Sequence, residues 1–221
     1  MHVRRSVLRA ALGAAAFAAV SSTVQAQAAN YPAFEVPRIE SRALNFAVAD
    51  GDDWGTQLLF QWREGVRPRM QLGLDAGFGD PEGGDSYMFL GGNLGYQLTR
   101  SNANMPLDVM LTAGINGAFS DPIDVIRVPV GVSVGHRFDL DGPMSITPFA
   151  HPRLIIDHCS EDCFGADDAT DFGLGFDIGA DFAFSPQAAV RFAISLSNGE
   201  LFDDQDSFGL GFVWRPASSR R

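Results

Sequence analysis

The sequence contains no lysine: all 16 of its basic residues are arginines, against 27 aspartates and glutamates. The formal net charge of −11 argues against nucleic acid as a partner, because binding there depends on neutralising phosphates. After residue 29 there is no run of 18 or more apolar residues, so no helix of this chain is expected to cross a membrane. Any membrane crossing must therefore be made by strands.

The first 28 residues are typical of a cleaved signal peptide. Arg4, Arg5 and Arg9 form a basic start, residues 10–20 form an apolar core, and small residues near Ala26 suit signal peptidase. The Arg4-Arg5 pair also resembles a twin-arginine export signal, so the export route stays open. Removal of three arginines makes the mature chain still more acidic, and export places it outside the cytoplasm.

Alternation between apolar side chains and small or polar ones is the most frequent pattern in the sequence. Every second residue from Phe172 to Phe184 is apolar, whereas the residues between them are Asp, Gly or Ala. A strand has a side-chain period of two, so such a stretch has one apolar face and one narrow, polar face. We predict ten strands of this kind, at residues 41–49, 54–63, 68–79, 86–98, 107–118, 125–138, 144–156, 171–184, 188–197 and 207–215.

The connections between these strands alternate in character. Those near Gly65, Asn102, Gly142 and Ser185 are expected to be mostly short, whereas every second connection is acidic and in two cases long. This alternation predicts hairpins that place both chain termini at the end with the short turns. It resembles the layout of bacterial outer-membrane barrels, whose periplasmic turns are short and whose outer loops are longer.

The last predicted strand strengthens the resemblance. Ser207, Gly209, Phe212 and Trp214 resemble the terminal signal by which the barrel-insertion machinery reads outer-membrane barrel proteins, although that signal usually ends at a terminal aromatic and here residues 215–221 follow. The resemblance implies a Gram-negative outer membrane with both termini periplasmic. It divides the chain into a signal peptide (1–28), a periplasmic N-terminal lead (29–40), a barrel (41–215) and a C-terminal tail (216–221).

The predicted fold is all-β: a closed, antiparallel, up-and-down transmembrane β-barrel of about ten strands. Hydrocarbon offers no hydrogen bonds, so the sheet must close and remove its edges. Pro129, Pro148 and Pro152 lie inside the sixth and seventh predicted strands and lack a backbone donor. We therefore expect bulges at these prolines, or a barrel of eight strands.

The polar faces should line the lumen. Buried charges persist when they are paired, so we expect arginines and aspartates to form networks there, with glycines giving them room. The predicted network contains Arg69, Asp75, Asp108, Arg127, His151, Arg153, Asp177, Asp181 and Arg191. A barrel of this size is largely filled by its own side chains, which argues against a wide pore. Arg127, Arg153 and Arg191 either select small anions or pair with carboxylates and fix the strand register.

Cys159 and Cys163 are placed in the longest outer loop of an exported chain, where a disulfide is expected. A metal site made with His158 is the alternative, but the chain has no further cysteine to complete a tetrahedron. Two acidic clusters remain open as either solvated surfaces or Ca²⁺ or Mg²⁺ sites. They are Asp167, Asp168 and Asp171, and Asp203, Asp204 and Asp206.

The sequence indicates a monomeric structural or surface protein, or a narrow channel, without enzymatic activity or cofactor. Its expected partners are outer-membrane lipids, lipopolysaccharide and the insertion machinery. One alternative is a barrel enzyme with His151, Asp157 and His158 near the outer rim, although no Gly-x-Ser-x-Gly motif is present. The other is a soluble periplasmic barrel that binds an apolar ligand, which requires the apolar face to turn inward.

Overall fold

The computed structural model describes residues 31–51, 55–81, 86–120, 123–163, 166–198 and 206–217. The regular elements of these residues are strands: β1 (Arg42–Gly51), β2 (Gly55–Arg67), β3 (Met70–Asp80), β4 (Tyr87–Thr99), β5 (Asp108–Ser120), β6 (Ile123–Gly135), β7 (Phe138–Asp139), β8 (Ser145–Cys163), β9 (Ala166–Ala183), β10 (Ala188–Asn198) and β11 (Ser207–Trp214). Within the described ranges, no helix has the length and apolar character needed to cross a membrane.

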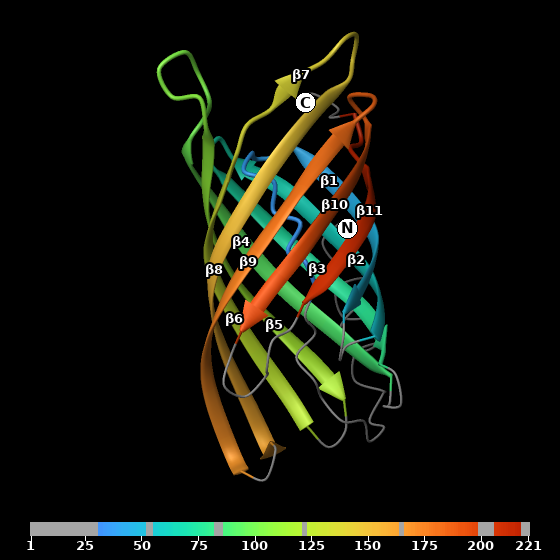
Figure 1. Ribbon diagram of the computed structural model, residues 1–221, viewed down its shortest axis with the longest axis vertical. Helices are drawn as coiled ribbons and strands as arrows, with labels where there is room; N and C mark the ends of the chain where they lie inside the picture. Colours follow the sequence, from blue (N-terminus) through green and yellow to red (C-terminus); the bar gives the residue numbers. More distant parts are fainter. Residues whose placement is uncertain are drawn as a thin grey trace, which may run out of the picture.

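The strands form a closed ring (Figure 1). Antiparallel pairing runs in chain order from β1 to β6, passes from β6 to β8, and continues to β11, which pairs back with β1. The two-residue strand β7 only adds to β8, so ten strands make up the ring. The predicted closed antiparallel barrel is therefore confirmed with ten strands, and the alternative of eight is wrong.

The apolar faces point outward. Phe172 is 73% exposed and Leu210 and Phe176 are also exposed, whereas Asp177 is 0% exposed and Arg191 is buried. From Ala189 to the end of β10, and along all of β11, buried and exposed residues alternate one by one. An apolar exterior around a polar interior suits hydrocarbon outside and contradicts the alternative of a soluble barrel with an apolar ligand inside.

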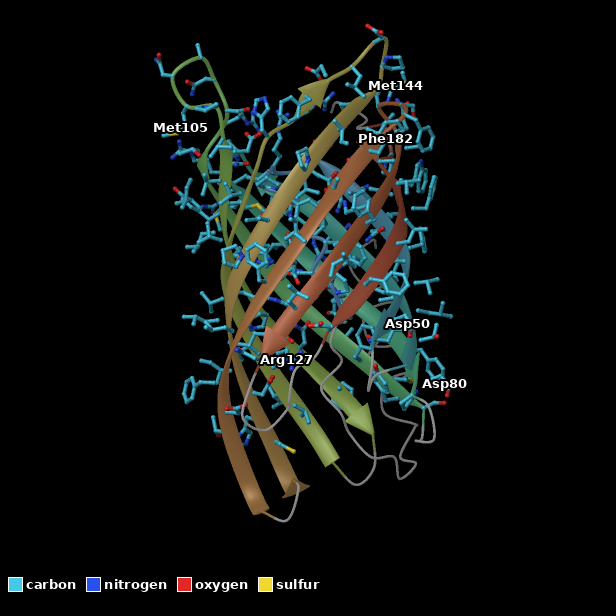
Figure 2. All side chains as sticks on the ribbon, viewed as in Figure 1. Asp50, Asp80, Met105, Arg127, Met144 and Phe182 are labelled. Atoms are coloured by element: carbon cyan, nitrogen blue, oxygen red, sulfur yellow. The ribbon has the colours of Figure 1, made fainter. Side chains whose placement is uncertain are left out.

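The two ends of the barrel differ in composition. The terminal end, where β1 begins and β11 ends, carries Met105 and Met144, whereas Asp50 and Asp80 lie toward the opposite, acidic end (Figure 2). The expected difference in connection length is wrong. At the acidic end, residues 121–122 suffice to join β5 to β6 and residues 164–165 to join β8 to β9, whereas at the terminal end β4 and β5 are joined by the longer connection of residues 100–107. Connection length therefore does not tell the two ends apart.

The hairpin of β8 and β9 explains why the connections at the acidic end are shorter than expected. We predicted that these strands end near residues 156 and 171, but their ladder continues from Asp157↔Asp171 to Cys163↔Ala166. The predicted long outer loop is thus mostly paired strand, which extends past the neighbouring strands at the acidic end (Figure 1). A strand beyond the hydrocarbon needs no apolar face, so its sequence lacks the alternation that revealed the others.

The expected bulges at the three prolines are also wrong. Pro129, Pro148 and Pro152 have partners in the ladder, and the register does not shift at any of them. Instead, pairing between β5 and β6 is interrupted between Ala113↔Val130 and Asn116↔Arg127, and then resumes in the same register. Loss of one backbone donor therefore opens the ladder locally, because the neighbouring pairs hold the register on both sides.

Residues 31–40, which we call the lumen segment, lie inside the ring. This blue segment precedes β1 and runs within the barrel (Figure 1), where Tyr31, Phe34, Glu35 and Val36 are buried. The sequence placed these residues in a periplasmic lead, outside the barrel. The lumen segment carries apolar side chains that pack against inward residues of the wall, such as Phe89 and Ala49.

Candidate functional site

The wall of the lumen is lined by paired charges. Arg127 of β6 donates from Nε to Asp157 of β8 at 2.7 Å and from Nη2 to the second carboxylate oxygen at 2.9 Å. Arg191 of β10 donates to Asp181 of β9 at 2.9 Å. These four side chains are buried, and each arginine lies on a strand next to that of its carboxylate. Such two-pronged contacts fix the register and pair both arginines with carboxylates, which argues against their selecting anions.

A second network surrounds Asp177 on β9. Its carboxylate accepts from Arg153 at 3.0 Å and contacts His151 Nδ1 at 3.1 Å, and the far nitrogen of His151 contacts Thr112 at 2.8 Å. Gly131 leaves the space beside His151, since an added Cβ would lie 2.7 Å from the imidazole Nε2. Thr112 of β5, His151 of β8 and Asp177 of β9 thus meet because β6, which lies between β5 and β8, has a glycine here.

Arg69 does not belong to this lining, and the prediction that it does is wrong. It is exposed in the turn between β2 and β3, because β3 begins at Met70 and not at residue 68. Arg63 of β2 takes the inward place that we expected for Arg69, and it contacts Asp75. Asp108 is buried near the terminal end, where it accepts from the backbone of Ser101 at 2.9 Å.

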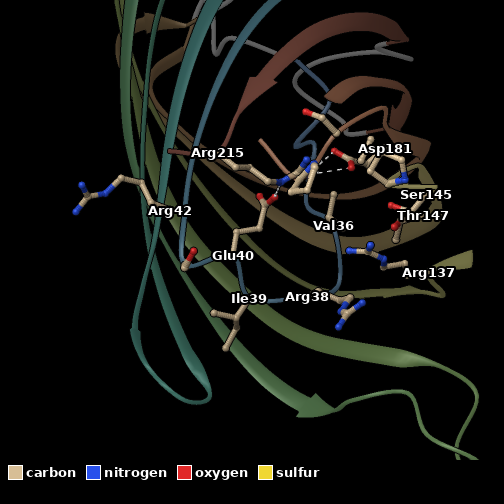
Figure 3. A pocket seen from close by; sticks show the side chains of 15 residues that line it. Val36, Arg38, Ile39, Glu40, Arg42, Arg137, Ser145, Thr147, Asp181 and Arg215 are labelled. Carbon is tan, nitrogen blue, oxygen red and sulfur yellow. Dashed lines mark hydrogen bonds and ion pairs between the residues drawn. The ribbon is translucent and has the colours of Figure 1, made fainter. Parts of the chain in front are cut away.

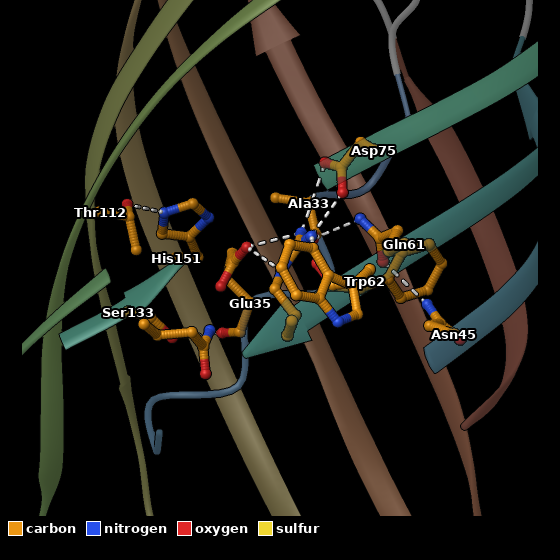
Figure 4. Close-up of polar contacts among 12 residues, drawn as sticks. Ala33, Glu35, Asn45, Gln61, Trp62, Asp75, Thr112, Ser133 and His151 are labelled. Carbon is orange, nitrogen blue, oxygen red and sulfur yellow. Dashed lines mark hydrogen bonds and ion pairs between the residues drawn. The ribbon is translucent and has the colours of Figure 1, made fainter. Parts of the chain in front are cut away.

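Side chains of the wall bind the backbone of the lumen segment (Figure 4). Gln61 donates to the carbonyl of Ala33 at 3.2 Å. Arg191 donates to the carbonyl of Phe34 at 3.0 Å, and Ser133 donates to that of Glu35. Closer to the terminal end, Gln97 donates to the carbonyl of Pro37 and accepts from the amide of Ile39, while Gln71 accepts from the amide of Glu40.

Two carboxylates of the lumen segment reach arginines of the wall. Glu35 contacts Arg63 at 2.8 Å, and both side chains are buried. Glu40 contacts Arg215 at 2.6 Å (Figure 3) and Arg191 at 3.3 Å. Burial raises the pKa of Glu40, but the two positive charges outweigh burial and hold it below its ordinary value. At neutral pH the carboxylate of Glu40 is therefore ionised, and it anchors this end of the segment.

Little open space remains around the lumen segment. A cavity of about 40 Å³ lies between Tyr31, Asn116 and His151. A larger cavity of about 290 Å³ opens at the terminal end between Arg38, Glu40 and Arg137 (Figure 3). The lumen is thus open at the terminal mouth, and further in it is filled by the lumen segment and the paired charges.

The other candidate sites from the sequence are only partly described. Cys159 is buried on β8, but the side chain of Cys163 lies outside the described part, so their disulfide stays a prediction. His158 contacts Thr170 at 3.0 Å. The side chains of the acidic clusters fall mostly outside the described part, and among the described residues no group of three His, Cys, Asp or Glu residues is placed to hold a metal ion.

The predicted insertion signal forms β11, which closes the ring between β1 and β10. Ser207 points inward, and Phe212 and Trp214 point outward. Arg215, which we assigned to residues trailing beyond the signal, contacts Glu40 and Asp181. Sequence reasoning missed the lumen segment with Glu35 and Glu40. The only available signal was an apolar, proline-rich stretch, with Tyr31 and Phe34, directly before the first strand.

Residues 10–215 match the model of a family described as "Outer membrane protein beta-barrel domain". Among solved structures, the chain is similar to the beta domain of the Bordetella autotransporter BrkA, with 10% sequence identity, a TM-score of 0.53, and 78% of this chain and 97% of that chain covered. It also resembles Neisserial surface protein A, with 16% identity, a TM-score of 0.39, and coverage of 79% and 95%. No curated protein matches the sequence. Because the family model spans most of the chain, this protein belongs to the outer membrane β-barrel domain family.

Proposed function

We propose that this protein is a sealed structural barrel of a Gram-negative outer membrane, with periplasmic termini, acidic connections at the cell surface and no enzymatic activity. The observation that carries the proposal is the filled lumen. The lumen segment contacts inward side chains of the wall, and the cavity beside His151 measures only about 40 Å³. Since a water molecule needs roughly 10–15 Å³ of such space, this cavity holds only a few water molecules, which supports a lumen closed to ions.

Membrane lipids are the partners that the exterior supports. Exposed Phe, Leu, Ile and Val side chains cover the wall, and Tyr96 and Trp214 near the terminal end suit the headgroup level. Such a surface needs acyl chains and no second protein layer, which favours a monomer. The acidic connections would face lipopolysaccharide, and β11 would be the strand that the insertion machinery reads.

The contacts of the histidines do not favour an enzyme. His151 contacts Thr112 and Asp177, whereas Asp157 is bound by Arg127, so the rim site considered from the sequence does not assemble. His151 and its two partners are all buried beside the lumen segment, out of reach of a lipid or a peptide at the rim. We infer that these networks hold the wall together.

Fractionation and bilayer recording test the proposal. The mature protein should sediment with outer membranes, change its gel mobility on boiling, and show no discrete conductance steps when purified into planar bilayers. Regular single-channel steps from the wild-type protein would contradict a sealed lumen.

The orientation is tested separately with epitope insertions. An epitope after Asn104, which is exposed at the terminal end, should bind antibody only in permeabilised cells. A matched epitope after Pro81, at the acidic end, should bind antibody on intact cells. The reverse pattern would show that the termini face the cell surface.

A further inference from the structure

The lumen segment is held in place differently from a strand. None of residues 31–40 is part of the described ladder, and its backbone is bound by side chains from β2, β3, β4, β6 and β10. Its contacts reach from Arg215 at the terminal end to Phe89 on β4, whose ring stacks on Tyr31 with centroids 4.9 Å apart. The segment is thus bound along the lumen as an extended peptide is bound in a groove.

The charges of the wall stay paired without the segment. Arg63 contacts Asp75 as well as Glu35, and Arg191 and Arg215 both contact Asp181 as well as Glu40. Leaving a buried charge without a partner is strongly destabilising, whereas here each arginine keeps a carboxylate of the wall. Departure of the segment therefore leaves no bare arginine behind.

The segment is also held in a conformation that its own residues disfavour. Phe34 has a φ of 52°, a left-handed backbone that bulky side chains rarely adopt, and among the described residues other than glycine it alone has a positive φ. Its ring lies against β11 where Gly209 has no side chain, since an added Cβ there would come within 2.6 Å of it. Contacts with the wall hold this backbone, and release of the segment would relax it.

The surface behind the segment is polar. Gln61, Gln71, Gln97 and Ser133, which hold the segment, are all buried and inward-facing, as is Asn45. An emptied space lined by such groups fills with water, because amides and hydroxyls need hydrogen-bond partners. Water along a charged lumen is the medium through which small ions pass.

We propose that residues 31–40 are a removable plug, and that the barrel becomes a pore for small ions when this segment leaves the lumen. The inference goes beyond the sealed barrel proposed above and depends on the lumen being closed while the segment is bound. It assigns to the barrel a second, conducting state and identifies the occupant that prevents it.

Deletion of residues 31–38 is the direct test. The variant is refolded in parallel with the wild-type protein, a mobility shift on boiling identifies folded barrels, and both are recorded in planar bilayers in potassium chloride. We expect discrete conductance from the deletion variant and none from the wild type. A synthetic peptide of residues 31–40 should then reduce this current when added. A folded deletion variant as silent as the wild type would overturn the plug, whereas a conducting wild type would overturn the sealed barrel instead.

Charge variants of the full chain give a second test, which does not depend on the deletion variant folding. Glu35→Gln combined with Glu40→Gln removes both anchoring charges and leaves the wall unchanged. Glu64→Gln is the matched control, because Glu64 contacts Arg42 on the exposed side of β1 and β2. We expect the double variant to open at least ten times more often than the control. Equal opening of the two variants would overturn the role of these carboxylates as anchors.

Discussion

The wall of the barrel and the segment inside it are stabilised by different interactions. Each strand of the ring is joined to two neighbours by a backbone ladder, which hydrocarbon requires because it offers no other hydrogen-bond partners. The lumen segment has no ladder and is bound by the side chains of residues such as Gln61, Gln97 and Arg191. Side-chain contacts can be exchanged for water inside a polar lumen, whereas a ladder in lipid cannot.

The comparison separates the contacts that stabilise the fold from those that hold the segment in the lumen. Charge pairs between adjacent strands, such as Arg127 with Asp157, belong to the wall and should be needed for the fold. Pairs that include Glu35 or Glu40 belong to the segment and should govern only its occupancy of the lumen. Variants on the two sides of this division should therefore have separable effects.

The largest effect is expected from Asp177→Ala in the wall. This change leaves Arg153 and His151 buried without their carboxylate, and loss of one partner of a buried pair costs about 3–5 kcal/mol. Urea unfolding of the refolded barrel, followed by the mobility shift, measures the loss. Asp139→Ala, in an exposed pair with Arg137, is the control. If both variants unfold at the same urea concentration, the inward pairs do not stabilise the wall.

A smaller effect is expected from acid acting on the segment. The pKa of Glu40 is lowered in the folded protein, so its contribution is complete above the ordinary pKa of a glutamate, about 4.3, and is lost as the pH falls through the lowered value. Arg191, Arg215 and Asp181 are the charged groups that face this anchor. We expect the wild-type protein to begin conducting only when the pH falls below the ordinary pKa of a glutamate and protonation neutralises the carboxyl of Glu40.

Recording the opening frequency against pH, for the wild type and for Glu40→Gln, measures this dependence. The variant lacks the titrating group and should open at neutral pH with a weaker response to acid. Identical pH profiles for the two proteins would show that Glu40 does not anchor the segment.

The smallest effect is expected from Glu64→Gln. Its partner Arg42 is exposed, and exposed ion pairs contribute little because water screens them. Urea unfolding and conductance should both be unchanged within error. A clear loss of stability would mean that exposed charge pairs on the outside of the wall also stabilise its terminal end.

The wall was largely predictable from the sequence, and residues 171–184 show why. One side chain in two must be apolar where lipid covers the strand, so the period of two is imposed on the sequence directly. The same rule explains the failure at residues 157–163 and 166–170, where the hairpin extends past the neighbouring strands and its sequence lacks this period. It also explains why Arg69 was misplaced, since the pattern does not mark where a strand begins.

The lumen segment was not predictable in the same way. Its contacts join Glu35 to β2 and Glu40 to β10 and to the chain after β11, so they exist only once the ring has closed. No period in the sequence encodes a segment that is bound by side chains from five strands. Pairing of arginine with aspartate in the lumen was foreseen as a principle, but the partners depend on register and on glycines such as Gly131.

The seam between the first and last strands has a consequence for biogenesis. Leu44 pairs with Trp214, so the ring stays open along one side until β11, near the end of the sequence, is available to pair with β1. Until then β1 and β10 both present unpaired edges, which can pair with other chains. Residues 31–40 must either be enclosed when β1 pairs with β11 or enter the closed ring afterwards through the terminal mouth. Only by the first route would the first closed molecule already contain its plug.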